Sequence, residues 1–200
     1  MRHLIAALCA VLLTPLAASA AAPIQSGSYN DAMLIGYDPA TGVISGYFEM
    51  QQDGPPTISC IFYLHGKLAG GKAAIQTYFP GTPKDVIGGT LAVKDAKDFA
   101  ISLKTEPGGC GNLEPFGNPG DPEGFDLAAA YPWTSVAVVK SAKAYVYASP
   151  GAAAHGKAYL MQGDGVGVRG AQSGWLRVDY VGGTKNVSGW LKTADLYPAP

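Results

Sequence analysis

Short apolar segments separated by glycine-bearing turns recur at intervals of roughly ten residues between positions 136 and 200. This rhythm is typical of a small all-β barrel. Val166 and Val168 alternate with glycine, so both side chains are predicted to point to one face of a strand. Leu176 and Val178 likewise share one face of the next strand. No apolar stripe at helical spacing competes with this pattern, so residues 136–200 are predicted to form a β domain.

Several short motifs of this domain occur in the order and spacing of a known family. They are Ala144–Pro150 (AYVYASP), Lys157–Leu160 (KAYL), Gly163-Asp164, the pairs Gly174-Trp175 and Gly189-Trp190, and Ala194–Leu196 (ADL). Through these motifs, residues 136–200, about a third of the chain, resemble a bacterial SH3 (SH3b-like) domain. The resemblance implies an SH3-like barrel without catalytic activity. Members of the family are often attached to secreted or periplasmic proteins, and some bind cell-wall peptides.

Trp175 matches the tryptophan that lines the peptide groove of SH3 domains that bind proline-rich motifs. The proline and tyrosine expected further along are absent, and Lys192, Ala194 and Asp195 stand there, so proline-motif recognition is not expected. Aromatic side chains on a rigid barrel still offer a large contact area. The candidate ligand-binding residues are therefore Trp175, Tyr145, Tyr147 and Trp190. The alternative is that the two tryptophans serve packing alone.

The first twenty residues have the pattern of a secretory signal peptide. Arg2 and His3 precede an apolar run from Leu4 to Leu13, which is too short to span a bilayer, and Ala18-Ser19-Ala20 has the small residues of a cleavage site. Residues 1–20 are therefore predicted to be removed, which places the mature chain in the periplasm or outside the cell. No apolar run of membrane-spanning length follows.

The charge pattern argues against nucleic acid as a partner. The chain has 14 basic and 15 acidic side chains, and the loss of Arg2 leaves the mature chain with a formal net charge of −2. No basic stripe or lysine cluster is present along the sequence. No clustered metal ligands or cofactor motif stand out either, so neither a metal nor a cofactor is expected.

Two cysteines remain in the mature chain, Cys60 and Cys110, and an even pair in an exported protein predicts a disulfide between them. Closing a loop of this size stabilises a fold by about 4 kcal/mol in the chain-entropy model. The alternative is a reactive thiol at Cys60 beside His65. Residues five apart on a strand face opposite sides, which disfavours that pair.

Residues 21–106 are predicted to form an antiparallel β domain, a barrel or a sandwich. Its six expected strands are 33–37, 43–48, 57–64, 73–78, 89–93 and 98–103, with a turn at Asp38–Gly42 and a loop at Gly66–Gly71. Their order is loosely similar to that of small calycin-type β-barrels. An aromatic set either lines a ligand pocket inside the barrel or forms ordinary core and cross-strand pairs. This set is Tyr29, Tyr37, Tyr47, Phe48, Phe62, Tyr63, Tyr78, Phe79 and Phe99.

Residues 107–135 are rich in glycine and proline at first and are predicted to be a long loop and linker. Phe116, Phe125 and Trp133 suggest that this linker packs between the two domains. Asp121, Glu123 and Asp126 lack the ordered spacing of a calcium loop, so a solvated turn is expected.

The sequence predicts no enzyme, because none of the common nucleophile, zinc or phosphate-binding motifs is present and the mature chain's two histidines lie in different domains. We therefore expect an exported, noncatalytic binding protein of the bacterial envelope whose SH3-like module contacts a cell-wall peptide, peptidoglycan or an envelope protein. The alternatives are an inhibitor of a secreted enzyme, which would use loop Gly66–Gly71 or Gly108–Gly120, and a small-ligand carrier that uses the first barrel.

Overall fold

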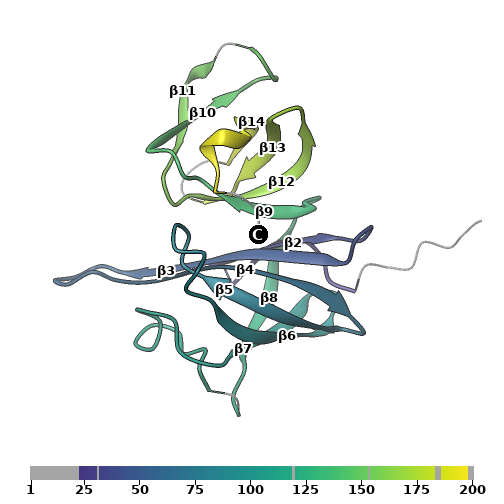
Figure 1. Ribbon diagram of the computed structural model, residues 1–200, viewed down its shortest axis with the longest axis vertical. Helices are drawn as coiled ribbons and strands as arrows, with labels where there is room; N and C mark the ends of the chain where they lie inside the picture. The colour runs from purple at the N-terminus through teal and green to yellow at the C-terminus, as the bar shows by residue number, and fades with distance from the viewer. Residues whose placement is uncertain (1–22, 31, 119, 153, 183–185, 198–200) are drawn as a thin grey trace, which may run out of the picture.

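The protein is all-β and consists of a closed antiparallel barrel followed by a six-stranded sheet (Figure 1). The computed structural model describes residues 23–197 except 31, 119, 153 and 183–185, and it leaves the side chains of residues 154–157 undescribed. The all-β class and the first barrel are confirmed. The predicted signal peptide at residues 1–20 lies outside the described residues. Within residues 23–197, no helix has the length and apolar character needed to cross a membrane.

Eight strands form the barrel, and each pairs with the next along the chain. They are β1 (Gly27–Tyr29), β2 (Met33–Asp38), β3 (Val43–Gln52), β4 (Ile58–Ala69), β5 (Lys72–Tyr78), β6 (Ile87–Asp95), β7 (Asp98–Leu103) and β8 (Glu123–Ala130). The six predicted strands correspond to β2–β7. Strand β8 closes the barrel by pairing with β1, although its residues fall in the stretch that the sequence predicts as a linker. This short segment forms a strand because it pairs with a strand at the other end of the domain.

The turn between β2 and β3 agrees with the sequence prediction, whereas the turn between β4 and β5 differs from it. Between β2 and β3, the Asp38 carboxylate accepts hydrogen bonds from the Ala40 N–H at 2.9 Å and the Thr41 hydroxyl at 2.7 Å. The prediction of a loop over Gly66–Gly71 is wrong, because β4 continues to Ala69 and β5 begins at Lys72. The two glycines between them have φ values of 58° and 77°, which suit a two-residue hairpin turn.

Aromatic side chains fill the interior of the barrel. Phe48 stacks on Phe62 with ring centroids 5.2 Å apart, and the Phe116 ring lies edge-on to both at 5.1 and 5.0 Å. Phe99 and Phe125 stack at 5.1 Å. Phe116 and Phe125 were expected between the domains, but both are buried in the barrel core instead. Burying the large apolar area of these two rings inside the barrel stabilises the fold more than a contact between the two domains could.

The predicted disulfide between Cys60 and Cys110 is confirmed. It joins β4 to the loop that follows β7, and both cysteines are fully buried. The loop is held further by Glu106, whose carboxylate accepts hydrogen bonds from the backbone N–H groups of Phe116 and Gly117. Cys60 therefore has no free thiol to act beside His65.

The second sheet contains six strands in the order β11-β10-β14-β13-β12-β9. Their bounds are β9 (Ser135–Val138), β10 (Lys143–Tyr147), β11 (Ala154–Met161), β12 (Gly165–Gln172), β13 (Trp175–Tyr180) and β14 (Val187–Lys192), followed by a 3-10 turn at Thr193–Asp195. A separate hydrophobic core includes Val146, Val166, Val168, Val178 and Leu191. Val166, Val168 and Val178 thus occupy the core face that their alternation predicted.

The sheet packs on the outside of the barrel through β9, which lies between the two units in Figure 1. Glycines permit this close approach. A methyl group on Gly36 of β2 would overlap the backbone of Ser135, and one on Gly165 of β12 would overlap the Tyr47 ring. One on Gly167 would overlap the ring of Trp133, which is buried. The alternation of glycine and valine along β12 therefore places the valine side chains in the core of the second sheet. The glycines on the opposite face allow Tyr47 and Trp133 to pack closely against the strand.

Replacing both cysteines, as in C60A/C110A, should lower the free energy of unfolding by up to about 4 kcal/mol, because the unfolded chain loses a long closed loop. Denaturant unfolding of the mature oxidised protein and the double variant measures the difference. An unchanged unfolding midpoint would contradict a stabilising role for the bridge.

Gly167→Ala should destabilise the protein by about 1–3 kcal/mol, because the added methyl group forces the Trp133 ring out of its buried position. Gly170→Ala on the same strand is the matched control, since a methyl group there meets no atom within 4 Å. Thermal unfolding of both variants tests the packing. Equal effects of the two substitutions would show that close approach at Gly167 does not matter.

Candidate functional site

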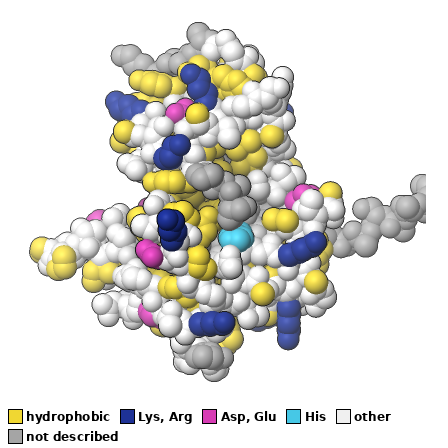
Figure 2. Space-filling view, in the orientation of Figure 1, with side chains coloured by type: hydrophobic (Ala, Val, Ile, Leu, Met, Phe, Trp, Pro, Cys, Tyr) yellow, Lys and Arg dark blue, Asp and Glu magenta, His cyan; other side chains and the backbone are white. Residues whose placement is uncertain are grey.

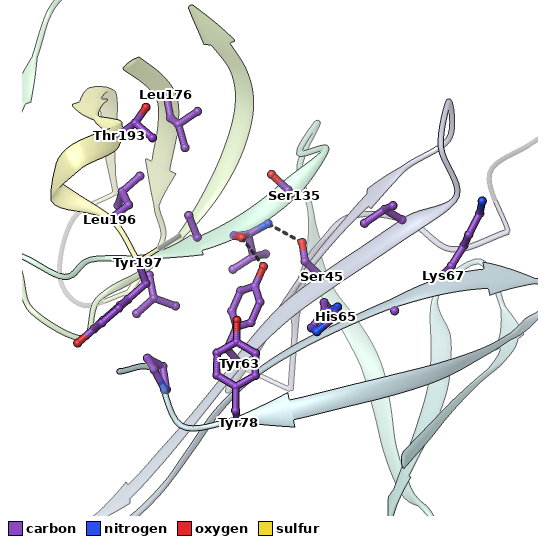
Figure 3. A pocket seen from close by; sticks show the side chains of 16 residues that line it. Ser45, Tyr63, His65, Lys67, Tyr78, Ser135, Leu176, Thr193, Leu196 and Tyr197 are labelled. Carbon is purple, nitrogen blue, oxygen red and sulfur yellow. Dashed lines mark hydrogen bonds between the residues drawn. The ribbon is translucent and has the colours of Figure 1, made fainter. Parts of the chain in front are cut away.

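A cleft lies at the waist between the barrel and the second sheet, and Figure 2 shows hydrophobic side chains around this waist. Its volume is about 620 Å³. One wall is the outer surface of β3, β4 and β5, and the other is β9 with Leu176 and the C-terminal segment. Its principal side chains, shown in Figure 3, are Ser45, Tyr63, His65, Lys67, Tyr78, Ser135, Leu176, Thr193, Leu196 and Tyr197.

Two side chains of the barrel hold the backbone of β9 in place at Val136. The Val136 N–H donates to the Ser45 hydroxyl oxygen at 2.9 Å, and the Tyr63 hydroxyl donates to the Val136 carbonyl oxygen at 3.1 Å (Figure 3). Both bonds are buried, and burial raises the pKa of Tyr63 to about 12. Tyr63 therefore stays protonated as a donor at neutral pH. The cleft wall is fixed by hydrogen bonds and does not depend on apolar contact alone.

Apolar packing surrounds these two bonds. Tyr47, Tyr63 and Tyr78 of the barrel form a buried cluster with Val136 and Val138 of β9. The three tyrosines belong to the aromatic set for which the sequence allowed either a pocket inside the barrel or ordinary core and cross-strand pairing. They are cross-strand neighbours, since Tyr63 pairs with Tyr47 and with Tyr78, but they lie on the outer face of the barrel and build the junction. Strand alternation explains this placement, since Tyr47 and Tyr63 neighbour the inward-facing Phe48 and Phe62.

The polar groups near the middle of the cleft are uncharged at neutral pH. Burial lowers the pKa of His65 below its ordinary value, and a hydrogen bond with Gln76 offsets this only in part. The His65 ring lies 6.2 Å from the ring of Tyr78, whose pKa is raised by burial. Lys67 follows on the same strand and is exposed to solvent. The arrangement offers apolar walls with neutral hydrogen-bonding groups, which suits noncovalent binding of a ligand.

The four candidate residues predicted from the sequence lie elsewhere, on the second sheet, and the structure brings them together. Tyr147 and Trp175 meet edge to face with ring centroids 4.8 Å apart. Trp190 is the cross-strand partner of Tyr147, and Tyr145 is two residues away on β10. All four share one face of the sheet. They do not take part in the cleft.

Sequence reasoning missed the cleft because its walls come from segments far apart in the chain, with separations of 73 residues from Tyr63 to Val136 and 91 from Ser45 to Val136. Ser45 and His65 are polar residues that directly follow the apolar residues Ile44 and Leu64 in β3 and β4, which was the available signal. In the described part of the chain, no group of three or more His, Cys, Asp or Glu side chains is placed to hold a metal ion.

Comparisons of the chain with protein-family models, with curated proteins and with solved structures give no match.

The neutral state of His65 predicts how stability depends on pH. Because the pKa of His65 is lower in the folded protein, the unfolded chain takes up a proton first as the pH falls below about 6.5. This difference lowers the free energy of unfolding as the pH becomes more acidic. His65→Gln should remove the contribution of His65 to this pH dependence. Urea unfolding of both proteins between about pH 7 and pH 5 measures it.

Two carboxyl groups also contribute to the pH dependence of stability. Burial raises the pKa values of Glu49 and Asp164, and raised carboxyl pKa values act in the opposite direction by stabilising the fold as the pH falls. The difference between wild type and His65→Gln therefore isolates the histidine. Parallel curves for the two proteins would show that His65 is not held neutral by its burial.

Proposed function

We propose that this protein is an exported, noncatalytic binding protein that holds a small amphipathic molecule in the cleft between its barrel and its second sheet. The observation that carries the proposal is the cleft itself, about 620 Å³ in volume and lined mainly by apolar side chains. Sites for small molecules typically measure about 300–1,000 Å³ and combine apolar walls with a few polar groups. The cleft meets both conditions.

The ligand chemistry follows from the lining. Val43, Leu176 and Tyr197 line the cleft and expose apolar surface there, so the body of the ligand is apolar. His65 is neutral and can donate or accept one hydrogen bond at each ring nitrogen. A hydroxyl or similar uncharged head group fits beside His65, because this ring is neutral and Lys67, the charged side chain of the lining, is exposed to solvent.

Two further considerations support an exported location. The disulfide is of the kind that persists in oxidising compartments, and the sequence predicts a signal peptide at residues 1–20. The resemblance of residues 136–200 to bacterial SH3 modules agrees with a role in the bacterial envelope. It also agrees with the absence of catalytic motifs from the sequence.

The other functions considered from the sequence have less support. A carrier that uses the barrel interior would need space that the rings of Phe48, Phe62 and Phe116 occupy. An inhibitor that inserts residues 66–71 would need a free loop, but most of this segment is paired strand. In the other proposed loop, Gly108–Gly120, Cys110 and Phe116 are buried.

Titration of the mature protein, residues 21–200, with octan-1-ol, octanoate and octylammonium tests the proposal by calorimetry. We expect octan-1-ol to bind most tightly of the three. Val43→Trp, which places a large side chain in the cleft from an exposed position on β3, should weaken this binding about tenfold or more. Ala128→Trp is the matched control, since Ala128 is exposed on the barrel strand β8.

The result that would overturn the proposal is absence of binding by all three amphiphiles, or equal affinity of the Val43→Trp and Ala128→Trp variants. Tighter binding of octanoate or octylammonium than of octan-1-ol would leave the cleft as a site but refute an uncharged head group.

A further inference from the structure

Charge is unevenly divided between the two parts of the chain. Residues 136–200 contain seven basic and three acidic side chains, whereas residues 1–135 contain seven basic and twelve acidic ones. The net charge of −1 for the whole chain conceals this division. The second sheet is therefore a positively charged unit attached to a negatively charged barrel.

Three of its cations lie on the same face as the four predicted aromatic residues. Lys192 is the cross-strand partner of Trp175, and Arg177 is the partner of Trp190. Lys143 lies two residues before Tyr145 on β10, and its partner strand contributes Tyr159. We name this surface the aromatic–cationic face. It consists of Tyr145, Tyr147, Tyr159, Trp175 and Trp190 with Lys143, Arg177 and Lys192.

The ammonium groups lie directly above the rings. Lys192 Nζ is 5.5 Å from the centroid of Tyr147 and 5.8 Å from that of Trp175, and Lys143 Nζ is 4.6 Å from that of Tyr159. These distances are within the range of cation–π contacts. The two ion pairs found among the described residues, Lys94–Asp98 and Arg169–Asp179, involve none of the three cations of the face. Their charge is therefore available to a partner.

The face also exposes apolar surface at one edge of the sheet. Tyr145 is 43% exposed, Tyr159 42% and Met161 49%, and all three lie on the paired strands β10 and β11. Large exposed hydrophobic side chains grouped in this way mark interaction surfaces. Tyrosine, tryptophan, methionine and arginine are the residue types enriched where proteins contact one another. The composition therefore favours a polypeptide partner.

We propose that the aromatic–cationic face binds an acidic polypeptide segment whose carboxylates pair with Lys143, Arg177 and Lys192 and whose apolar side chains pack on the rings between them. Charge complementarity selects the partner, because the face carries three cations and no ion-paired carboxylate of its own. This site is separate from the cleft and does not depend on it.

A random copolymer of glutamate and tyrosine is the probe, and the tryptophan fluorescence of the mature protein reports binding. We expect the copolymer to bind and poly-glutamate to bind more weakly, since poly-glutamate lacks rings to pack. K143Q/R177Q/K192Q should weaken copolymer binding about tenfold or more. K72Q/K84Q/K97Q makes the same change of charge at three exposed lysines of the barrel and should leave binding unchanged.

A second variant separates ring contacts from charge. Tyr145→Ser with Tyr159→Ser keeps every cation and alters two exposed side chains, so folding is preserved, and it should weaken copolymer binding while leaving poly-glutamate binding as it was. Raising the salt concentration should weaken binding to the wild type.

Several results would overturn the proposal. Equal copolymer binding by K143Q/R177Q/K192Q and K72Q/K84Q/K97Q would show that the aromatic–cationic face is not the binding site. Stronger binding of dextran sulfate or polyuridylate than of the copolymer would show a general polyanion surface. Retention on purified peptidoglycan without copolymer binding would assign the face to the cell wall. Self-association at low salt, lost in K143Q/R177Q/K192Q, would identify the acidic barrel of a second copy as the occupant.

Discussion

The structure depends on how the backbone of β9 is held against the outside of the barrel. Ser45 and Tyr63 satisfy both the N–H and the carbonyl group of Val136 through two buried hydrogen bonds. Leaving one such buried group without a partner costs about 1–3 kcal/mol, so the barrel wall dictates the position of β9. The rest of the second sheet follows from β9 through its pairing with β12. The cleft between the units exists because this docking is fixed.

A second anchor comes from the segment that connects the two units. Trp133 is buried and donates from Nε1 to the Asp179 carboxylate at 2.8 Å, and Arg169 and Ser188 donate to the same carboxylate. Burial alone would raise the pKa of Asp179, but these three hydrogen bonds outweigh it and lower the pKa below its usual value. The charged carboxylate therefore joins the connecting segment to β12 and β14 at neutral pH.

Local signals predicted much of the fold, and long-range pairing explains what they missed. The hairpins of β2–β7 follow from alternation and turn residues, and parity of the cysteines predicted the disulfide. Strand β8 depends on pairing with β1, nearly a hundred residues away, and no local pattern shows that partner. The four aromatic candidates came from the resemblance to an SH3 domain and from their residue type, and local alternation along β10 explains why Tyr145 and Tyr147 lie on one face. The sequence did not predict the cleft, because the cleft forms only where the outer surface of the barrel meets the second sheet.

Strand β13 contributes to both proposed sites, through neighbouring residues. Leu176 points into the cleft, whereas Trp175 and Arg177 point to the opposite face, as alternation along a strand requires. The strand is paired on both sides, with β12 and β14, so its backbone is held along its length by hydrogen bonds to two neighbours. Coupling between two sites requires an element with two arrangements whose balance both ligands change. Because both of its edges are paired, β13 is poorly suited to be such an element, and we expect the two proposed sites to bind their ligands independently.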